Sequence, residues 1–263
     1  MTLADQITAL VLTYNEEDNI GRTLASLAWV QRILVIDSGS SDQTLAIIGR
    51  FPQAEVVSRA FDSFAAQCNF GLSRVASPWV LSLDADYVVS ESLAREIQTL
   101  APTEDISGFR TSFIYRVRGR DLRSTLYPSR TVLYRRDRAK YRNVGHGHRV
   151  EIAGLIGALR APIYHDDRKP LSRWFATQQR YAQLEADYLL GLPRAKLRRT
   201  DTLRLQAWPT PVLVFFHTLI IKRCALDGWA GWLYVLQRTL AETLIAIEIV
   251  DRRLRSGTKY QIE

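Results

Sequence analysis

The stretch Ser-Pro-Trp-Val-Leu-Ser-Leu-Asp-Ala-Asp-Tyr, residues 77–87, runs from a short apolar segment directly into two carboxylates. In an extended strand, side chains two positions apart point to the same face, so Asp84 and Asp86 project together unless the backbone turns there. Their like charges repel, and either a divalent cation or a basic partner elsewhere in the fold must offset the repulsion. The stretch therefore predicts a buried strand that ends at a charged site.

Apolar runs of the same kind lie upstream of this stretch. These runs, like residues 79–83, are nearly continuously apolar, which is typical of buried strands in a parallel sheet. The predicted strands are residues 7–13, 33–37, 55–58 and 79–83, and the segments with helical spacing between them are residues 19–27, 42–51 and 63–75. This alternation predicts an α/β class protein with a doubly wound, mostly parallel sheet and helices on both faces.

Polar residues follow three of these strands. Thr-Tyr-Asn-Glu-Glu (13–17) follows the first, Asp-Ser-Gly-Ser-Ser-Asp (37–42) the second and Asp-Ala-Asp (84–86) the fourth. Ligands of such sheets bind beyond the carboxyl ends of the strands, so the three clusters predict one shared site. Ser41 and Asp42 alone are explained by an N-cap and a favourable first-turn acid, whereas Asp37 ends a buried strand.

Composition limits the class of protein. The chain has 263 residues with 47% hydrophobic content, which suits one large α/β domain with an appendage. The net charge of +8 and pI of about 9.7 favour a polyanionic partner. Cys68 and Cys224 have neither disulfide-framework nor zinc-site spacing, and the N-terminus lacks a secretory signal pattern. We therefore expect a protein of the reducing cytosol.

Arginines and tyrosines concentrate between residues 110 and 142, where extended segments are predicted at 108–118 and 131–134. No nucleic-acid-binding motif accompanies them, so a phosphate-rich small substrate or a lipid headgroup fits equally well. Farther on, His146, His148 and His165 cluster. Their spacing is compatible with zinc, but neither thiolates nor a His-Glu-x-x-His helix support a structural zinc site.

The last third of the chain predicts helices over residues 170–190, 209–221 and 228–250. The apolar run 209–221 is shorter than the roughly 20 residues that a membrane span requires. It is either a buried core helix or an interfacial helix at a membrane surface, with Trp208, Trp229 and Trp232 at headgroup level. The flanking tryptophans and basic residues favour the interfacial reading. We expect a catalytic domain over residues 1–168 and a helical, amphipathic region over 169–263.

A carboxylate pair at the carboxyl edge of a parallel sheet, with basic surroundings, suits a nucleoside diphosphate that a divalent metal bridges to the protein. A dinucleotide-binding site competes with this interpretation. However, Thr-Tyr-Asn-Glu-Glu stands where that fold needs its Gly-x-Gly-x-x-Gly turn, and the chain has no Walker-type Gly-Lys-Ser.

These motifs resemble the family 2 inverting glycosyltransferases of GT-A fold. The resemblance covers roughly the first hundred residues and rests on segments 12–17, 35–44, 69–71 (Asn-Phe-Gly) and 83–86 (Leu-Asp-Ala-Asp). More loosely, segments 127–130, 133–136, 141–143, 164–170 and 178–182 resemble the bacterial lipopolysaccharide core β-1,4-glucosyltransferase branch. The resemblance implies a GT-A-type sheet with a helical C-terminal extension.

The resemblance also implies site residues. The nucleotide-binding set would be Thr13, Tyr14, Asn15, Glu17, Asp37, Asn69 and Asp84, and the metal set Asp86 and His165. An inverting transfer needs a base that takes the acceptor hydroxyl proton. The branch would have a His-Glu pair near residue 147, but this chain reads His146-Gly147-His148. The candidate bases are therefore Glu151, His148 and Asp166, in that order.

The function that we expect is a metal-dependent hexosyltransferase that uses Mn²⁺ or Mg²⁺. It would move a sugar from a nucleotide sugar, UDP-linked, to a membrane glycolipid or lipopolysaccharide-core acceptor. It would act in the cytoplasm at the inner membrane, in peripheral contact with anionic lipid and without nucleic acid. The alternatives are a catalytically silent sugar-nucleotide or lipid-binding module and a metal-dependent nucleotidyltransferase. The latter would need a Gly-rich, Lys-containing loop near the first strand, which the sequence lacks.

Overall fold

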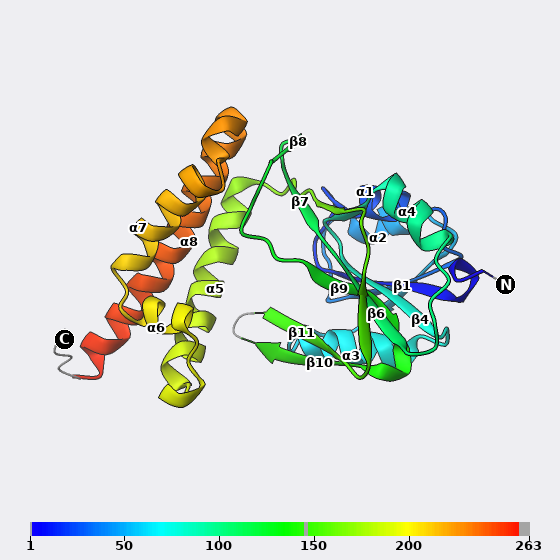
Figure 1. The fold of residues 1–263 in the computed structure, drawn as a ribbon, viewed down its shortest axis with the longest axis horizontal. Coiled ribbons are helices and arrows are strands. Elements are labelled where there is room, and N and C mark those ends of the chain that lie inside the picture. The colour runs from blue at the N-terminus through cyan, green and yellow to red at the C-terminus, as the bar shows by residue number, and fades with distance from the viewer. Residues whose placement is uncertain (1, 145–146, 258–263) are drawn as a thin grey trace. The chain divides into compact units, whose positions relative to one another are not determined.

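The computed structural model of the chain describes residues 2–144 and 147–257 (Figure 1). Its contacts divide it into two compact units. The first comprises Met1–Asp121 and Tyr127–Lys169, and the second comprises Leu122–Leu126 and Pro170–Glu263. Each unit has a core of its own and is described separately below.

A seven-stranded sheet in the order β12-β6-β9-β4-β1-β2-β3 forms the centre of the first unit. Strands β1, β2, β3 and β4 are parallel, and β12 is parallel to β6, while β9 pairs antiparallel with β4 and β6. The bounds are β1 (Ile7–Thr13), β2 (Arg32–Asp37), β3 (Ala54–Ser58), β4 (Trp79–Asp84), β6 (Ile106–Thr111), β9 (Arg130–Arg135) and β12 (Leu155–Ala158). The prediction of a mostly parallel α/β sheet is confirmed.

Helices cover both faces of this sheet (Figure 1). They are α1 (Ile20–Ala25), α2 (Thr44–Ile48), α3 (Phe64–Arg74) and α4 (Glu91–Gln98), with short 3₁₀ turns η1 (Ala4–Gln6) and η2 (Arg136–Arg138). Successive strand residues alternate between the two faces. Val11 and Leu83 therefore pack in the core with α1 and α4, whereas Leu10 packs with Leu72 of α3.

Strand β3 differs from the expectation of a buried strand. It is the edge of the sheet, and only Ala54 and Val57 are partly buried, whereas Glu55 and Val56 are exposed. An edge strand has a sheet neighbour on one side only, so part of its surface stays in contact with water.

Two smaller sheets complete the first unit. One has the order β5-β13-β7-β8, and the other is the hairpin β10-β11. The bounds are β5 (Tyr87–Val89), β7 (Phe113–Val117), β8 (Arg120–Asp121), β10 (Ala139–Val144), β11 (Gly147–Ile152) and β13 (Ile163–His165). A turn at residues 85–86 separates β4 from β5, so the backbone changes direction between Asp84 and Asp86. The extended geometry that would align their side chains therefore ends at Asp84.

The second unit is helical, as predicted. It contains α5 (Leu171–Gly191), η3 (Arg194–Lys196), α6 (Arg199–Leu205), α7 (Pro209–Phe216), the π-helical turn η4 (His217–Ile221), η5 (Cys224–Asp227) and α8 (Gly228–Arg255). Helix α8 packs against α5 and α7. In its core Arg204 binds Glu185 at 3.2 Å and Glu242 at 2.6 Å, so the two buried carboxylates share one guanidinium. Among the described residues, no helix is both long enough and apolar enough to cross a membrane.

Candidate functional site

Strand register brings the three predicted polar clusters to one edge of the main sheet. Thr13 of β1 pairs with Asp37 of β2, and Leu12 pairs with Asp84 of β4. The carboxyl ends of three parallel strands are therefore level with one another. This is the edge at which ligands bind in open α/β sheets.

Asn15 and Asp37 connect the loops that follow β1 and β2. The Asn15 side-chain oxygen accepts a hydrogen bond from Ser41 N at 2.7 Å, and Ser40 Oγ accepts one from Asn15 N at 2.8 Å. Asp37 is buried, and its Oδ2 accepts hydrogen bonds from the Gly39 and Ser40 amides, both at 2.9 Å. Asn15 has a left-handed φ of 53°, which asparagine tolerates better than most residues. These two side chains thus fix the shape of the edge.

The other nucleotide-binding candidates differ in exposure. Thr13 is buried, whereas the ring of Tyr14 is 53% exposed. Glu17 Oε2 accepts a hydrogen bond from Gln43 N at 2.9 Å, which places it between the same two loops. Asn69 of α3 makes a pair of hydrogen bonds with the backbone of Tyr141, at 3.0 Å and 2.9 Å, and so connects α3 to β10.

Asp86 and His165 lie in contact although 79 positions separate them. His165 Nε2 is 3.2 Å from Asp86 Oδ2, and both side chains are 14% exposed. Strand β13 places His165 beside both β5 and β7, where its ring packs against Tyr87, Tyr115 and Tyr127 at 4.6–5.3 Å. Burial alone would raise the pKa of Asp86, but the charge and hydrogen bond of His165, together with Lys169, hold that pKa well below its usual range.

The structure adds Lys169, a functional candidate that the sequence analysis did not select. Its ammonium lies 2.7 Å from Glu16 Oε1, 3.4 Å from Asp167 Oδ1 and 3.9 Å from Asp86 Oδ2. Burial would lower the pKa of Lys169, but the neighbouring carboxylates raise it on balance, so it stays charged. A basic partner therefore does offset the negative charge of Asp86. Lys169 and Glu16 both lie in the resembled motifs, in segments 164–170 and 12–17, and this was the signal in the sequence that could have selected them.

Asp166, one of the predicted bases, is buried and ion-paired. Its carboxylate lies 2.9 Å from Arg168 Nη2 and 3.5 Å from Arg22 Nε, and its side chain is 1% exposed. Arg22 also donates a hydrogen bond to the Asp166 carbonyl at 2.8 Å. These contacts attach the segment after β13 to α1.

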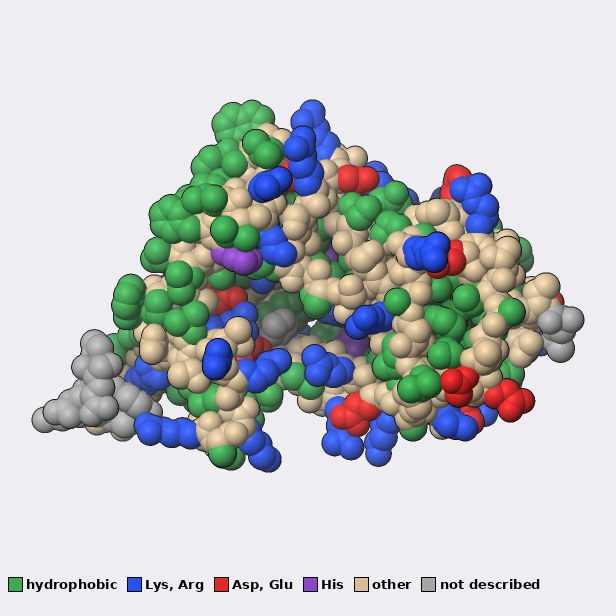
Figure 2. Space-filling view, in the orientation of Figure 1, with side chains coloured by type: hydrophobic (Ala, Val, Ile, Leu, Met, Phe, Trp, Pro, Cys, Tyr) green, Lys and Arg blue, Asp and Glu red, His purple; other side chains and the backbone are tan. Residues whose placement is uncertain are grey.

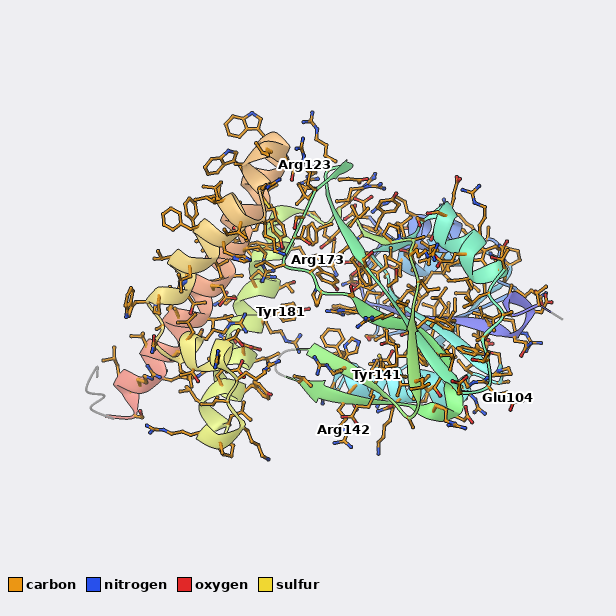
Figure 3. All side chains as sticks on the ribbon, viewed as in Figure 1. Glu104, Arg123, Tyr141, Arg142, Arg173 and Tyr181 are labelled. Carbon is orange, nitrogen blue, oxygen red and sulfur yellow. The ribbon has the colours of Figure 1, made fainter. Side chains whose placement is uncertain are left out.

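Glu151 and His148 lie three positions apart on β11 and so face opposite sides of the hairpin. The Glu151 side chain is 49% exposed and lies 2.7 Å from Arg142 Nε. The ring of His148 packs against Phe64 and Tyr141, with centroids 5.6 Å and 5.3 Å away. Figure 3 labels Tyr141 and Arg142, successive residues of β10 that mark these two faces. The third histidine of the cluster, His146, lies outside the described residues.

His148 lies on the side of the hairpin that is affected by the charges of Asp84 and Arg130. Burial lowers the pKa of His148, while Asp84 opposes this effect and Arg130 adds to it. Arg130 stacks 4.7 Å from the Tyr127 ring and donates a hydrogen bond to the Tyr87 hydroxyl at 3.4 Å. Asp84, Arg130 and His148 thus interact electrostatically at the carboxyl end of β4.

Comparisons with known proteins identify a family and several relatives. The profile of the family described as Glycosyl transferase family 2 matches residues 8–164. The lipopolysaccharide core biosynthesis glycosyltransferase LpsC of Rhizobium meliloti is 30% identical over 112 residues, which span 40% of this chain and 41% of LpsC. An uncharacterized glycosyltransferase of Rickettsia conorii is 23% identical over 270 residues, which span 97% of this chain and 93% of that relative.

Two solved structures also align with the chain. S. aureus TarS residues 1–349 align with a TM-score of 0.48 and 15% identity, over 98% of this chain and 94% of TarS. Glucosyl-3-phosphoglycerate synthase from Mycobacterium tuberculosis aligns with a TM-score of 0.46 and 18% identity, over 72% of this chain and 81% of the synthase.

Proposed function

The chain belongs to glycosyl transferase family 2, and on that premise we propose that it transfers one sugar, with inversion, from a UDP-linked donor to a lipid-bound glycan of the lipopolysaccharide-core type. The observation that carries the proposal is the contact between Asp86 and His165 at the carboxyl end of the sheet. The relationship to LpsC supports the acceptor class. The enzyme would work at the cytosolic face of the inner membrane.

The nucleotide would lie along the edge formed by β1, β2 and β4. Tyr14 presents an exposed ring for stacking on the base, and Glu17 and Asp84 offer carboxylates to the base or ribose hydroxyls. Asn15, Asp37 and Thr13 would act by holding the two loops, since both Asp37 oxygens already accept hydrogen bonds within the loop. Asn69 would hold the β10-β11 hairpin beside this edge.

The residues present fit a divalent cation. Two ligands that share one metal at bond lengths of about 2.1 Å lie about 3 Å apart, and Asp86 Oδ2 and His165 Nε2 are 3.2 Å apart. Among the described residues no cluster of three metal-ligating side chains occurs, so the remaining positions would fall to the donor diphosphate and water. Bound Mn²⁺ or Mg²⁺ would supply positive charge for the leaving diphosphate.

We place the catalytic base at His148, ahead of Glu151 and Asp166. Because burial lowers its pKa, His148 is neutral near pH 7 and can accept the proton of the acceptor hydroxyl. Glu151 is half exposed and paired with Arg142, and Asp166 is buried against two arginines. An acceptor hydroxyl would have to compete with these arginines for either carboxylate.

The test is nucleotide release by the purified protein from UDP, GDP, CDP and dTDP sugars, with and without Mn²⁺ or Mg²⁺, in the presence of a rough lipopolysaccharide acceptor. We expect metal-dependent UDP release that is lost in Asp86→Ala and kept in Asp137→Ala, whose side chain is 68% exposed. Release of another nucleotide would overturn the UDP assignment. Donor binding without turnover would identify a silent binding module, and pyrophosphate release from a nucleoside triphosphate would identify a nucleotidyltransferase.

A further inference from the structure

One side of α7 and η4 is apolar and exposed. Trp208, Val212, Phe216 and Ile220 recur at intervals of four residues and are 72%, 51%, 52% and 60% exposed. The opposite side is covered, since Thr210 and Thr218 are buried. A four-residue interval drifts slowly around an α-helix, and the wider π-helical turn at His217–Ile221 counters this drift. The exposed side chains therefore form one continuous stripe.

The turn from η4 into α8 extends this stripe. Ile221 is 68% exposed and Trp229 is 86% exposed, which is a large apolar surface for a tryptophan. Figure 2 shows hydrophobic side chains gathered along the outer edge of α7 and this turn. We call Trp208, Val212, Phe216, Ile220, Ile221 and Trp229 the α7 apolar face. A contiguous apolar surface of this kind marks an interaction site.

Basic residues lie next to the α7 apolar face. Lys222 and Arg223 lie in the turn next to Ile221, and Arg123, 65% exposed, lies beside η5 through its ion pair with Asp227 at 3.2 Å. Residues 208–226 contain no aspartate or glutamate. Asp227, the first acid after them, is largely buried and accepts a hydrogen bond from Arg123 N at 3.2 Å.

We propose that the α7 apolar face lies in the interfacial layer of an anionic lipid bilayer, with Trp208 and Trp229 at headgroup level and Lys222 and Arg223 on lipid phosphates. Tryptophan suits this position because one end of its ring system is apolar and the other carries an N–H donor. An amphipathic helix with basic residues binds such a surface through apolar burial and charge attraction together. The inference rests on the proposed function in one respect only, since the lipid-bound acceptor is the reason for the enzyme to be at a membrane.

The charge pattern favours lipid over a second copy of the chain. In a two-fold symmetric dimer the same patch occurs on both partners, so Lys222 and Arg223 would face a surface that is also apolar and basic. The α7 apolar face contains no acid that would receive them. Anionic headgroups supply that charge.

The experiment is vesicle flotation of the full chain, without nucleotide sugar, on phosphatidylcholine and on phosphatidylcholine with 30% phosphatidylglycerol. We expect binding to the anionic vesicles, reduced at least tenfold in Ile221→Ser/Trp229→Ser and unchanged in Leu155→Ser, a 57% exposed residue of the first unit. Lys222→Gln/Arg223→Gln should bind anionic vesicles about tenfold more weakly and neutral vesicles as well as the wild type does. The reason is that each basic residue near the surface increases the affinity for anionic lipid several-fold. Brominated lipid should quench the tryptophan fluorescence of the wild type more than that of Trp229→Ser.

The outcomes are separable from those of the proposed function. Nucleotide release without lipid should be the same in Ile221→Ser/Trp229→Ser as in the wild type. If the wild type binds neither vesicle, or if the double variant binds as well as the wild type, the inference is wrong. It is also wrong if sedimentation shows a wild-type dimer that the double variant converts to a monomer. Vesicle binding without any nucleotide release would support the inference and overturn the proposed function instead.

Discussion

The ammonium of Lys169 lies 2.7 Å from the carboxylate of Glu16, and this contact joins the segment after β13 to the loop after β1. The two side chains are 16% and 14% exposed, and Asp86 and Asp167 lie within 4 Å of the same ammonium. One lysine thus balances several carboxylates next to Asp86. The repulsion between Asp84 and Asp86 can be offset by a divalent cation or by a basic partner, and the fold supplies the basic partner.

Replacing Lys169 with methionine should destabilise the first unit. At pH 8, where Glu16 is largely ionised, the change leaves Glu16 and Asp86 largely buried without this cation, and breaking a buried ion pair on one side costs about 3–5 kcal/mol. Urea denaturation of the full chain would measure the loss. Lys169→Arg should recover part of it, and Lys140→Met, at an exposed position of β10, should stay within about 0.5 kcal/mol of the wild type. A loss below 1 kcal/mol in Lys169→Met would show that the cluster is not held by this charge.

Stability should also depend on pH through Glu16. Burial raises the pKa of Glu16 from 4.5 to about 7, against the opposing effect of Lys169 and with a further increase from Asp86. Between these two pKa values the folded chain binds more protons than the unfolded chain, so this contribution to stability is full below pH 4.5 and is lost as the pH rises through 7. Relative to Glu16→Gln, the wild type should lose on the order of 2 kcal/mol over this range. Urea denaturation of both proteins at pH 5, 6, 7 and 8 would show no difference in slope if the pKa were lowered instead, because Glu16 would then be ionised in both states over this range.

The choice of base predicts different kinetics for His148 and Glu151. His148→Gln should lower kcat by about 10²–10⁴-fold with little change in the donor KM, because a base acts in the transition state. Glu151→Gln, on the exposed face of β11, should change kcat less than about threefold. The wild-type kcat should fall below pH 6.5 as His148 is protonated, and His148→Gln should lack this decline. If Glu151→Gln lowered kcat more than His148→Gln, the base would be Glu151 and not His148.

Gly231 should be essential to the turn that carries Trp229. A Cβ at Gly231 would lie 1.8 Å from the Cys224 carbonyl oxygen, so Gly231→Ala must displace the backbone of η5. Gly191, at the end of α5, has nothing within 4 Å of its Cβ position. Thermal unfolding should therefore show a lower Tm for Gly231→Ala and an unchanged or higher Tm for Gly191→Ala. Within a helix, alanine stabilises the folded state by about 0.5–1 kcal/mol relative to glycine. Equal Tm values for the two variants would mean that the backbone of η5 can shift without a loss of stability.

Much of the fold was predictable from local patterns. Apolar runs and helical spacings gave β1, β2 and β4 and the helices between them, because backbone sterics and burial act over a few residues. The shared edge followed as well, since parallel strands place their carboxyl ends together. The exposed surface of β3 was not predictable in the same way, because an apolar run does not indicate whether its strand lies at the edge of the sheet.

The sequence by itself determined the elements, the motifs at the strand ends and the family to which they belong. Only the tertiary structure decided which charges meet: Lys169 with Glu16, His165 with Asp86, and Glu151 with Arg142 away from His148. It also decided that the apolar side of α7 stays exposed when α8 packs against the other. The physical reason is that ion pairing and burial depend on distances between residues far apart in the chain, and local spacing carries no information about those distances until the fold closes.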